Sequence, residues 1–196
     1  MRNASSGVRI LLFATIGSFM LQGLVGEDTI MGFALWPLYE GFMPWQLFTY
    51  AFLHGNLMHL VFNMYGLWLF GSEMENLLGR RAFLYLYFAS VFSAAIMQLL
   101  VTSLTGGQYP TVGASGGVFG LLLAYGMFFP NRKLMLLFPP IPMPAWFFVT
   151  LYAVIELTLG VTGSQAGVAH FAHLGGMVGG YLVIRNWRNR SGSRRY

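Results

Sequence analysis

A run of fifty residues, 82–131, contains no Asp, Glu, Lys or Arg. A soluble domain carries about 25% charged residues, whereas this chain of 196 residues carries 9% and is 56% hydrophobic. Because a helix needs about 20 apolar residues to cross a bilayer, the run is long enough for two spans and the turn between them. The composition therefore predicts an integral membrane protein in contact with a lipid bilayer, and it excludes a disordered chain and a nucleic-acid partner.

Six apolar segments can be delimited, and we expect each to form a transmembrane helix in a single all-α membrane domain, residues 1–196. The segments cover residues 8–26, 51–71, 82–104, 115–130, 145–160 and 168–187, followed by a basic tail, 188–196. The long aromatic connection 27–50 is expected in the membrane interface. The first segment is long for a signal peptide and no small-x-small cleavage site follows it, so we expect it to stay as an anchor.

The basic residues orient this six-helix bundle. All eleven fall on one side of it: Arg2, Arg9, Arg80, Arg81, Arg132, Lys133, Arg185, Arg188, Arg190, Arg194 and Arg195. The positive-inside rule makes that side cytoplasmic, with both termini on it. The basic tail is then a topology signal, with contact to anionic lipid as a secondary role. We expect a multi-pass protein of a prokaryotic plasma (inner) membrane.

Three polar clusters lie inside the apolar segments, where polar side chains are costly and often functional. They are His54–Asn63, Gly113–Gly120 and His170–Gly180, and all four histidines of the chain belong to the first and third. His59 and His173 are about 8 and 5 residues into their segments, or roughly 12 and 8 Å, while Ser115 opens a short segment. We therefore expect the clusters to meet at one level in the outer, non-cytoplasmic half of the bundle.

Glycines predict a close contact between the fourth and sixth segments. The small-xxx-small pairs are Gly116 with Gly120, Gly175 with Gly179, and Gly176 with Gly180, and such pairs let helix backbones approach closely. A serine nucleophile and its base must lie about 2.6–3.2 Å apart. Spacing alone does not choose between His170 and His173 as that base. Gly176 and Gly180 follow His173 by three and seven residues, so they lie on the same helix face. Because that glycine face lets the fourth segment approach, we expect the base to be His173.

His59 and Asn63 are four residues apart, so they share a helix face. Both side chains can donate hydrogen bonds, as a group that stabilises an oxyanion must. Backbone N–H groups at the start of the Ser115 helix could add to the same site.

Together these stretches resemble the rhomboid family of intramembrane serine proteases, in its basic six-helix form. The matching residues are His59 and Asn63, Gly113-Ala-Ser115-Gly116, and Ala172-His173 with Gly176 and Gly180. The resemblance covers about residues 8–187. It implies that Ser115 is the nucleophile and His173 its base, with an oxyanion hole made by His59, Asn63 and the backbone around Ser115 and Gly113. It implies hydrolysis of peptide bonds in or beside transmembrane segments of substrate proteins, without metal or other cofactor.

Two positions depart from the family pattern. Many relatives have Trp-Arg in the first loop, where this chain has Trp45-Gln46. Some carry Tyr one turn after the nucleophile, where this chain has Phe119; the phenyl ring keeps a stacking surface for an imidazole but lacks the hydroxyl. Neither change touches the Ser–His pair, and both bear on substrate access and efficiency.

Three rival interpretations compete with this one. The order Ser115, Glu156, His173 fits a soluble hydrolase, but that fold needs a strand before the serine and none is indicated. Four histidines could bind zinc, but the H-E-x-x-H spacing is missing, and with no Cys no thiolate ligand exists. A non-catalytic relative should have lost Ser115 or His173, and a small transporter should show an inverted repeat. Glu156, inside the fifth segment, could bond a neighbouring helix, line a wet site or orient a histidine.

Overall fold

The chain is helical in class, as its composition predicted. The computed structural model describes residues 6–26, 30–135, 140–163 and 169–192. Its helices are α1 (Ser6–Gln22), α3 (Gln46–Thr49), η1 (Tyr50–Phe52), α4 (Leu57–Gly66), η2 (Leu67–Gly71), α5 (Ser72–Leu78), α6 (Arg80–Thr105), α7 (Ser115–Phe128), α8 (Ala145–Thr162) and α9 (His170–Gly192). Strands β1 (Lys133–Met135) and β2 (Pro142–Pro144) pair antiparallel as a small hairpin between α7 and α8.

Each apolar segment of the sequence contains a helix, although the boundaries differ. By length and composition, α6 and α8 can each cross a membrane, while α1 and α7 are shorter apolar helices. The second segment begins six residues later than predicted, at Leu57, because the Asn56 side chain accepts the backbone N–H of His59 at 2.8 Å and caps the helix there. It then continues through the π-helical turn η2 into α5, and α9 extends to Gly192. Residue 168, the predicted start of the sixth segment, lies outside the described residues.

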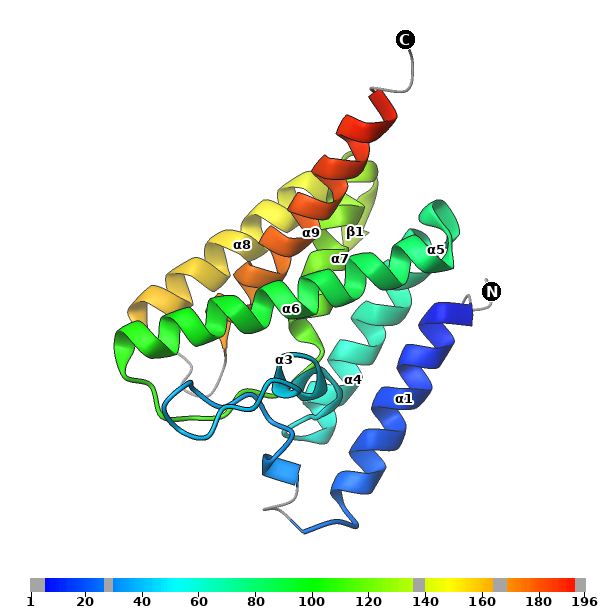
Figure 1. Cartoon of the computed structure of the whole chain (residues 1–196). Helices are drawn as coiled ribbons and strands as arrows, with labels where there is room; N and C mark the ends of the chain where they lie inside the picture. Colours follow the sequence, from blue (N-terminus) through cyan, green and yellow to red (C-terminus); the bar gives the residue numbers. More distant parts are fainter. Residues whose placement is uncertain (1–5, 27–29, 136–139, 164–168, 193–196) are drawn as a thin grey trace.

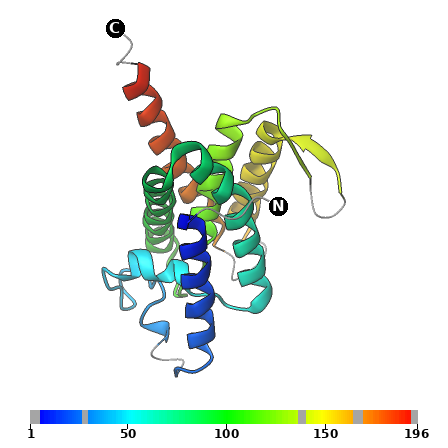
Figure 2. The same cartoon turned by 90° about the vertical axis from the view of Figure 1, so that its right-hand side faces the viewer.

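The bundle is centred on α7, which packs against α6 and α9 (Figure 1). Helices α8 and α9 lie side by side, and α1 lies at the opposite edge, beside α4. Both described ends of the chain lie at the same end of the bundle as the β1–β2 hairpin, whereas the start of α7 and the loop around α3 lie toward the other end (Figures 1 and 2). The start of α7 is therefore remote from both described chain ends.

The described basic residues gather at the end with the chain termini. Arg9 is in the first turns of α1, Arg80 and Arg81 open α6, Arg132 and Lys133 follow α7, and Arg185, Arg188 and Arg190 lie late in α9. The Arg132 guanidinium lies 2.8 Å from a Glu73 carboxylate oxygen, and this hydrogen bond raises the pKa of Arg132. Arg2, Arg194 and Arg195 lie outside the described residues.

A buried carboxylate holds α1 against the bundle. Glu75, on α5, accepts the backbone N–H groups of Gly7 at 2.7 Å and Val8 at 2.8 Å. These amides belong to the first turn of α1, which has no acceptor within its own helix. A carboxylate also suits the positive end of the helix dipole. This long-range cap explains why Glu75 lies buried beside the N-terminus of the apolar helix α1.

The loop before α3 is organised by Gln46. Its side-chain oxygen accepts the backbone N–H groups of Trp36 at 3.1 Å and Met43 at 3.2 Å, and its Nε2 donates to the Gly32 carbonyl at 3.2 Å. Gln46 is 1% exposed, so these contacts satisfy its buried polar atoms. The glutamine at this departure from the family pattern is therefore a structural centre of the loop.

Candidate active site

The turn before α7 places Ser115 at the first position of that helix. Gly113 has a backbone φ of +129°, a conformation open to glycine and costly for other residues. Its N–H donates to the Tyr50 carbonyl at 2.9 Å. Ala114 follows as the N-cap and has no side-chain acceptor to offer. The Ser115 N–H therefore starts the helix with no acceptor in its own helix.

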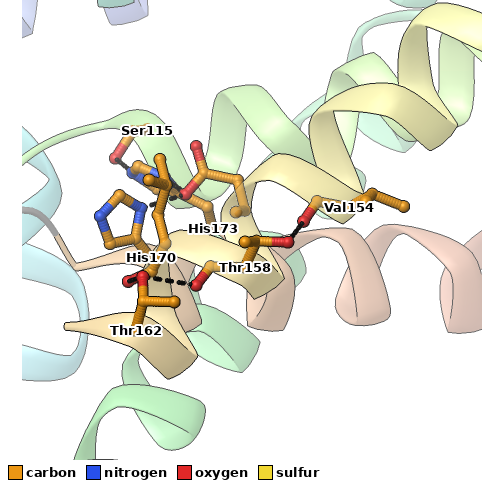
Figure 3. A network of polar contacts seen from close by, with 8 residues as sticks. Ser115, Val154, Thr158, Thr162, His170 and His173 are labelled. Carbon is orange, nitrogen blue, oxygen red and sulfur yellow. Dashed lines mark hydrogen bonds and ion pairs between the residues drawn. The ribbon is translucent and has the colours of Figure 1, made fainter. Parts of the chain in front are cut away.

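Ser115 faces His173 across the α7–α9 contact. The Ser115 Oγ lies 2.8 Å from the His173 Nε2, and both side chains are partly buried (Figure 3). The Phe119 ring, one turn after Ser115, stacks on the imidazole with centroids 4.4 Å apart and planes 5° from parallel. The distance is that of a serine with its general base, and the stacked ring fixes the plane of the imidazole.

Glycines make this approach of the helices possible. A Cβ at Gly176 would lie 2.7 Å from the carbonyl carbon of Gly116, and one at Gly180 would lie 2.7 Å from the carbonyl oxygen of Gly120. The other pair, Gly175 and Gly179, faces α6, where Ser93 and its neighbours lie. The glycines of α9 therefore form two stripes, and only one of them faces α7.

The other histidine of α9, His170, contacts Glu156. His170 Nδ1 lies 2.7 Å from Glu156 Oε2, and His173 Nδ1 lies 2.9 Å from the same oxygen (Figure 3). Glu156 is 8% exposed and His170 is 5% exposed. Of the three roles that the sequence left open for Glu156, the structure combines two, because it bonds a neighbouring helix and does so through histidines. The ligand atoms of Glu156, His170 and His173 lie within 4.8 Å of one another and could hold a metal ion, which would have to replace these hydrogen bonds.

The predicted oxyanion residues line the same cavity as Ser115. A Cβ at Gly113 would lie 2.8 Å from His59 Nε2 and 3.7 Å from Ser115 Oγ, so the His59 ring and the Ser115 hydroxyl both lie next to Gly113. Asn63 is buried and its Nδ2 donates to the His59 carbonyl at 2.8 Å. One amide hydrogen of Asn63 is thus used within α4, and the second remains to be donated elsewhere.

The backbone N–H of Gly113 is not available to an oxyanion. Its N–H is already given to Tyr50. The lack of a side chain, in contrast, is required, because any Cβ would overlap the His59 ring. Gly113 was predicted among the oxyanion residues. In the structure it leaves room for the His59 ring and does not offer its N–H.

His59 and His173 both lie nearer their helix starts than the sequence suggested. His59 is in the first turn of α4 and His173 in the first turn of α9. The clusters still meet at one level, since Ser115 begins α7. The level is the end of the helices, where the loops join them.

A cavity of about 890 Å³ opens onto the Ser–His pair. Its walls include Gly55 and Tyr109 near the start of α7, and Lys133 and Met135 of β1 at the other end. Between these ends the lining residues come from facing helices: Phe62, Asn63 and Leu69 from α4 and η2, Ser115 and Phe119 from α7, Phe148 and Tyr152 from α8, and Ala172 and His173 from α9. The cavity is therefore elongated along the bundle and mainly apolar away from the Ser–His pair.

The fold and the site define a helical membrane protein with a Ser–His pair held inside the bundle. The chain belongs to the rhomboid family, because a model of the Rhomboid domain matches residues 41–188. It is 34% identical to "Rhomboid protein 1, mitochondrial" of Saccharomyces cerevisiae over 67% of this chain and 38% of that protein. It is 31% identical to "Rhomboid protease GluP" of Bacillus subtilis over 71% of this chain and 25% of that protein.

A third relative is "Presenilin-associated rhomboid-like protein A, mitochondrial" of Danio rerio, 34% identical over 71% of this chain and 38% of that protein. The matched region thus spans well under half of each of these relatives. Two of the three are mitochondrial proteins by name. The relatives support a membrane protein of this family, and they do not support the predicted prokaryotic membrane over an organelle.

Several contacts that build the site carry no sequence signal of their own. Tyr50 accepts the Gly113 N–H through its carbonyl and donates its hydroxyl to the Val91 carbonyl at 2.8 Å. His54, 1% exposed, pairs its backbone N–H and carbonyl with the Gln22 side chain at 3.0 and 3.1 Å. These contacts join residues 32 to 63 positions apart, so no local pattern could indicate them.

Proposed function

We propose that this chain is an intramembrane serine endopeptidase that cleaves peptide bonds in or next to transmembrane segments of other membrane proteins. The observation that carries the proposal is the 2.8 Å contact between Ser115 Oγ and His173 Nε2 at the wall of the elongated cavity. Membership of the rhomboid family, one of whose members is named a protease, supports it.

The chemistry follows from the positions of the two side chains. Ser115 Oγ attacks the scissile carbonyl carbon while His173 Nε2 removes the hydroxyl proton. The protonated imidazole then gives that proton to the leaving amine, which departs with the C-terminal part of the substrate. A water molecule, deprotonated by the same imidazole, hydrolyses the acyl–serine ester and restores the enzyme. No metal or other cofactor takes part.

Charge that develops on the carbonyl oxygen needs donors in place before the reaction. The Ser115 N–H at the start of α7, the His59 ring and the second amide hydrogen of Asn63 are the groups that we assign to it. The assignment is supported by the cavity, which His59, Asn63 and Ser115 line together.

The cavity suits an unwound segment of a membrane protein. Its volume of about 890 Å³ is near the upper end of the range of ligand pockets, and its apolar walls run along the bundle rather than across it. Ser115 and His173 lie near the starts of their helices, and we expect the water needed for hydrolysis to enter from that end. An extended peptide along the cavity would place one backbone carbonyl at Ser115.

The predicted topology places this chemistry at the non-cytoplasmic side of the membrane. We propose six crossings with both termini in the cytoplasm, because the described basic residues lie at the end of the bundle remote from Ser115. The same basic end can contact anionic lipid headgroups.

A serine-directed fluorophosphonate tests the proposal. The native protein, reconstituted in liposomes, should be labelled and should cleave a transmembrane substrate, whereas Ser115→Ala and His173→Ala should do neither. Ser103→Ala, which alters an exposed serine on α6, is the matched control and should behave as native. Labelling and cleavage that persist in Ser115→Ala would refute Ser115 as the nucleophile, whereas native protein that is neither labelled nor active would favour a non-catalytic membrane-binding role.

A further inference from the structure

A buried carboxylate lies directly behind the base. Glu156 comes from α8, whereas Ser115 comes from α7 and His173 from α9. Glu156 Oε2 lies 2.9 Å from His173 Nδ1, and Ser115 Oγ lies 2.8 Å from the opposite ring nitrogen, Nε2. The three side chains therefore form a continuous chain of contacts that passes through one imidazole ring and joins three helices (Figure 3).

The chemistry of these atoms sets the positions of the protons. An ionised carboxylate can only accept hydrogen bonds, so the Nδ1 atom that contacts Glu156 carries a hydrogen. A neutral imidazole has only one N–H, and Nε2 of His173 is then left as an acceptor toward the Ser115 hydroxyl. This is the tautomer that a general base for Ser115 requires.

We propose that Glu156 is the positioning residue of a Ser115–His173–Glu156 relay, in which its carboxylate holds His173 in the reactive tautomer and stabilises the imidazolium formed during catalysis. The inference rests on the proposed protease function and adds a third member to its Ser–His pair. When Ser115 loses its proton to Nε2, the Nδ1–H stays on the ring and the carboxylate remains unprotonated. The negative charge of Glu156 then lies beside the new positive charge.

His170 completes the surroundings of the carboxylate. Its Nδ1 lies 2.7 Å from the same Oε2 atom, so one oxygen receives two N–H groups. A buried carboxylate is costly without such partners, and two donors hold it in one orientation. His170 therefore supports Glu156, and of the two histidines on α9 it is His173 that bonds the nucleophile.

The local structure of α8 is consistent with this role. Gly160, one turn after Glu156, lies so close to α9 that a Cβ there would be 3.0 Å from the Phe171 ring and 3.3 Å from His170 Cβ. The Thr158 hydroxyl is bonded to the Val154 carbonyl at 2.8 Å within α8. Glu156 is thus brought against α9 by a close helix contact, while the hydroxyl of Thr158 is turned back onto its own helix.

Two alternative roles for Glu156 lead to different expected results. Glu156 could serve only to tie α8 to α9, in which case its charge would have no effect on the chemistry of folded protein. Alternatively, Glu156, His170 and His173 could hold a metal ion, which would be bound in stoichiometric amount and lost on mutation of either Glu156 or His170.

The experiment compares the native chain with Glu156→Gln, which keeps the size of the side chain but removes its negative charge and replaces one carboxylate oxygen with an NH₂ donor. Thr158→Val on the same helix is the matched control, since Thr158 is exposed and its hydroxyl is bonded within α8. Measurements are kcat and KM on a transmembrane substrate, the fluorophosphonate labelling rate, thermal unfolding, bound metal, and ¹H–¹⁵N spectra of ¹⁵N-histidine protein.

The relay predicts that Glu156→Gln lowers kcat on the order of 10²–10⁴-fold, with little change in KM, and slows labelling in parallel. A strongly deshielded Nδ1–H resonance of His173 should appear in native protein and in Ser115→Ala, and should be lost in Glu156→Gln. His170→Ala should keep at least about a tenth of native activity, because one donor on the carboxylate remains. Thr158→Val should match native protein in every measurement.

Several results would overturn the relay. One is a folded Glu156→Gln protein with native kcat and labelling rate, and another is a stoichiometric bound metal that both Glu156→Gln and His170→Ala lose. A third is a His173→Ala protein that stays active beside an inactive His170→Ala protein. Cleavage that persists in Ser115→Ala would instead refute Ser115 as the nucleophile of the proposed function, and the Nδ1–H spectra would still test whether Glu156 bonds His173.

Discussion

Close contact between α7 and α9 is the feature of the fold on which the chemistry depends most, and Gly176→Ala tests it. Gly176 is one turn after His173, opposite Gly116, the residue that follows the nucleophile. The added Cβ would lie 2.7 Å from the Gly116 carbonyl carbon and 2.9 Å from its Cα, and closer still to its carbonyl oxygen. Carbon atoms in favourable contact are about 3.5–4.0 Å apart, so the backbones must separate by about 1 Å.

The consequence for the Ser–His pair can be worked from the same geometry. Ser115 Oγ and His173 Nε2 are 2.8 Å apart, and a further separation of about 1 Å exceeds the reach of a hydrogen bond. A misplacement of this size can cost about 10²-fold in rate. Overpacking of a tight contact typically costs about 1–3 kcal/mol of stability. We therefore expect Gly176→Ala to fold with a lower melting temperature and to cleave at least about a hundredfold more slowly.

The assay is cleavage of a transmembrane substrate in liposomes at equal folded protein, with fluorophosphonate labelling in parallel. Gly180→Ala is a graded comparison, because its Cβ would meet the Gly120 backbone at 2.7–3.2 Å but lies one turn further from the pair; we expect a stability loss with a smaller loss of rate. Gly17→Ala on α1 is the neutral control, since nothing lies within 4 Å of its Cβ. A folded Gly176→Ala protein with the native rate would refute the argument.

Three further predictions concern other parts of the molecule. Asn63→Ala and His59→Ala should each lower kcat by about 10–10³-fold, as loss of one oxyanion donor does; full activity in Asn63→Ala would reduce it to a helix-packing residue. Glu75→Gln should lower the free energy of unfolding by about 1–3 kcal/mol, because one amide oxygen replaces two carboxylate oxygens that accept from α1. The folded fraction of that variant should cleave normally. Loss of activity in fully folded protein would therefore contradict a purely structural role for this cap. Cysteines at Gln108 and Asn131, both exposed, should react with impermeant reagents from opposite sides of the membrane, and equal labelling from one side would contradict six crossings.

The sequence by itself determined the class of the protein. Fifty uncharged residues in a row leave no alternative to the membrane, and apolar segments separated by proline, glycine and charge delimit the helices. Polar residues inside those segments are costly in lipid, which is why Ser115, His59 and His173 could be singled out without a structure. The glycine stripe also favoured His173, and the structure places that ring on Ser115.

Only the tertiary structure decided what these residues touch. The sequence left three roles open for Glu156, and its contacts to His170 and His173 depend on how α8 packs against α9. No sequence pattern indicated a partner for the backbone N–H of Gly113, which donates to the carbonyl of Tyr50, 63 residues earlier. A helical period tells which residues share a face, and it does not tell which neighbouring helix that face meets. That choice is made by packing among several apolar helices, whose surfaces are too alike in sequence to distinguish before the bundle has formed.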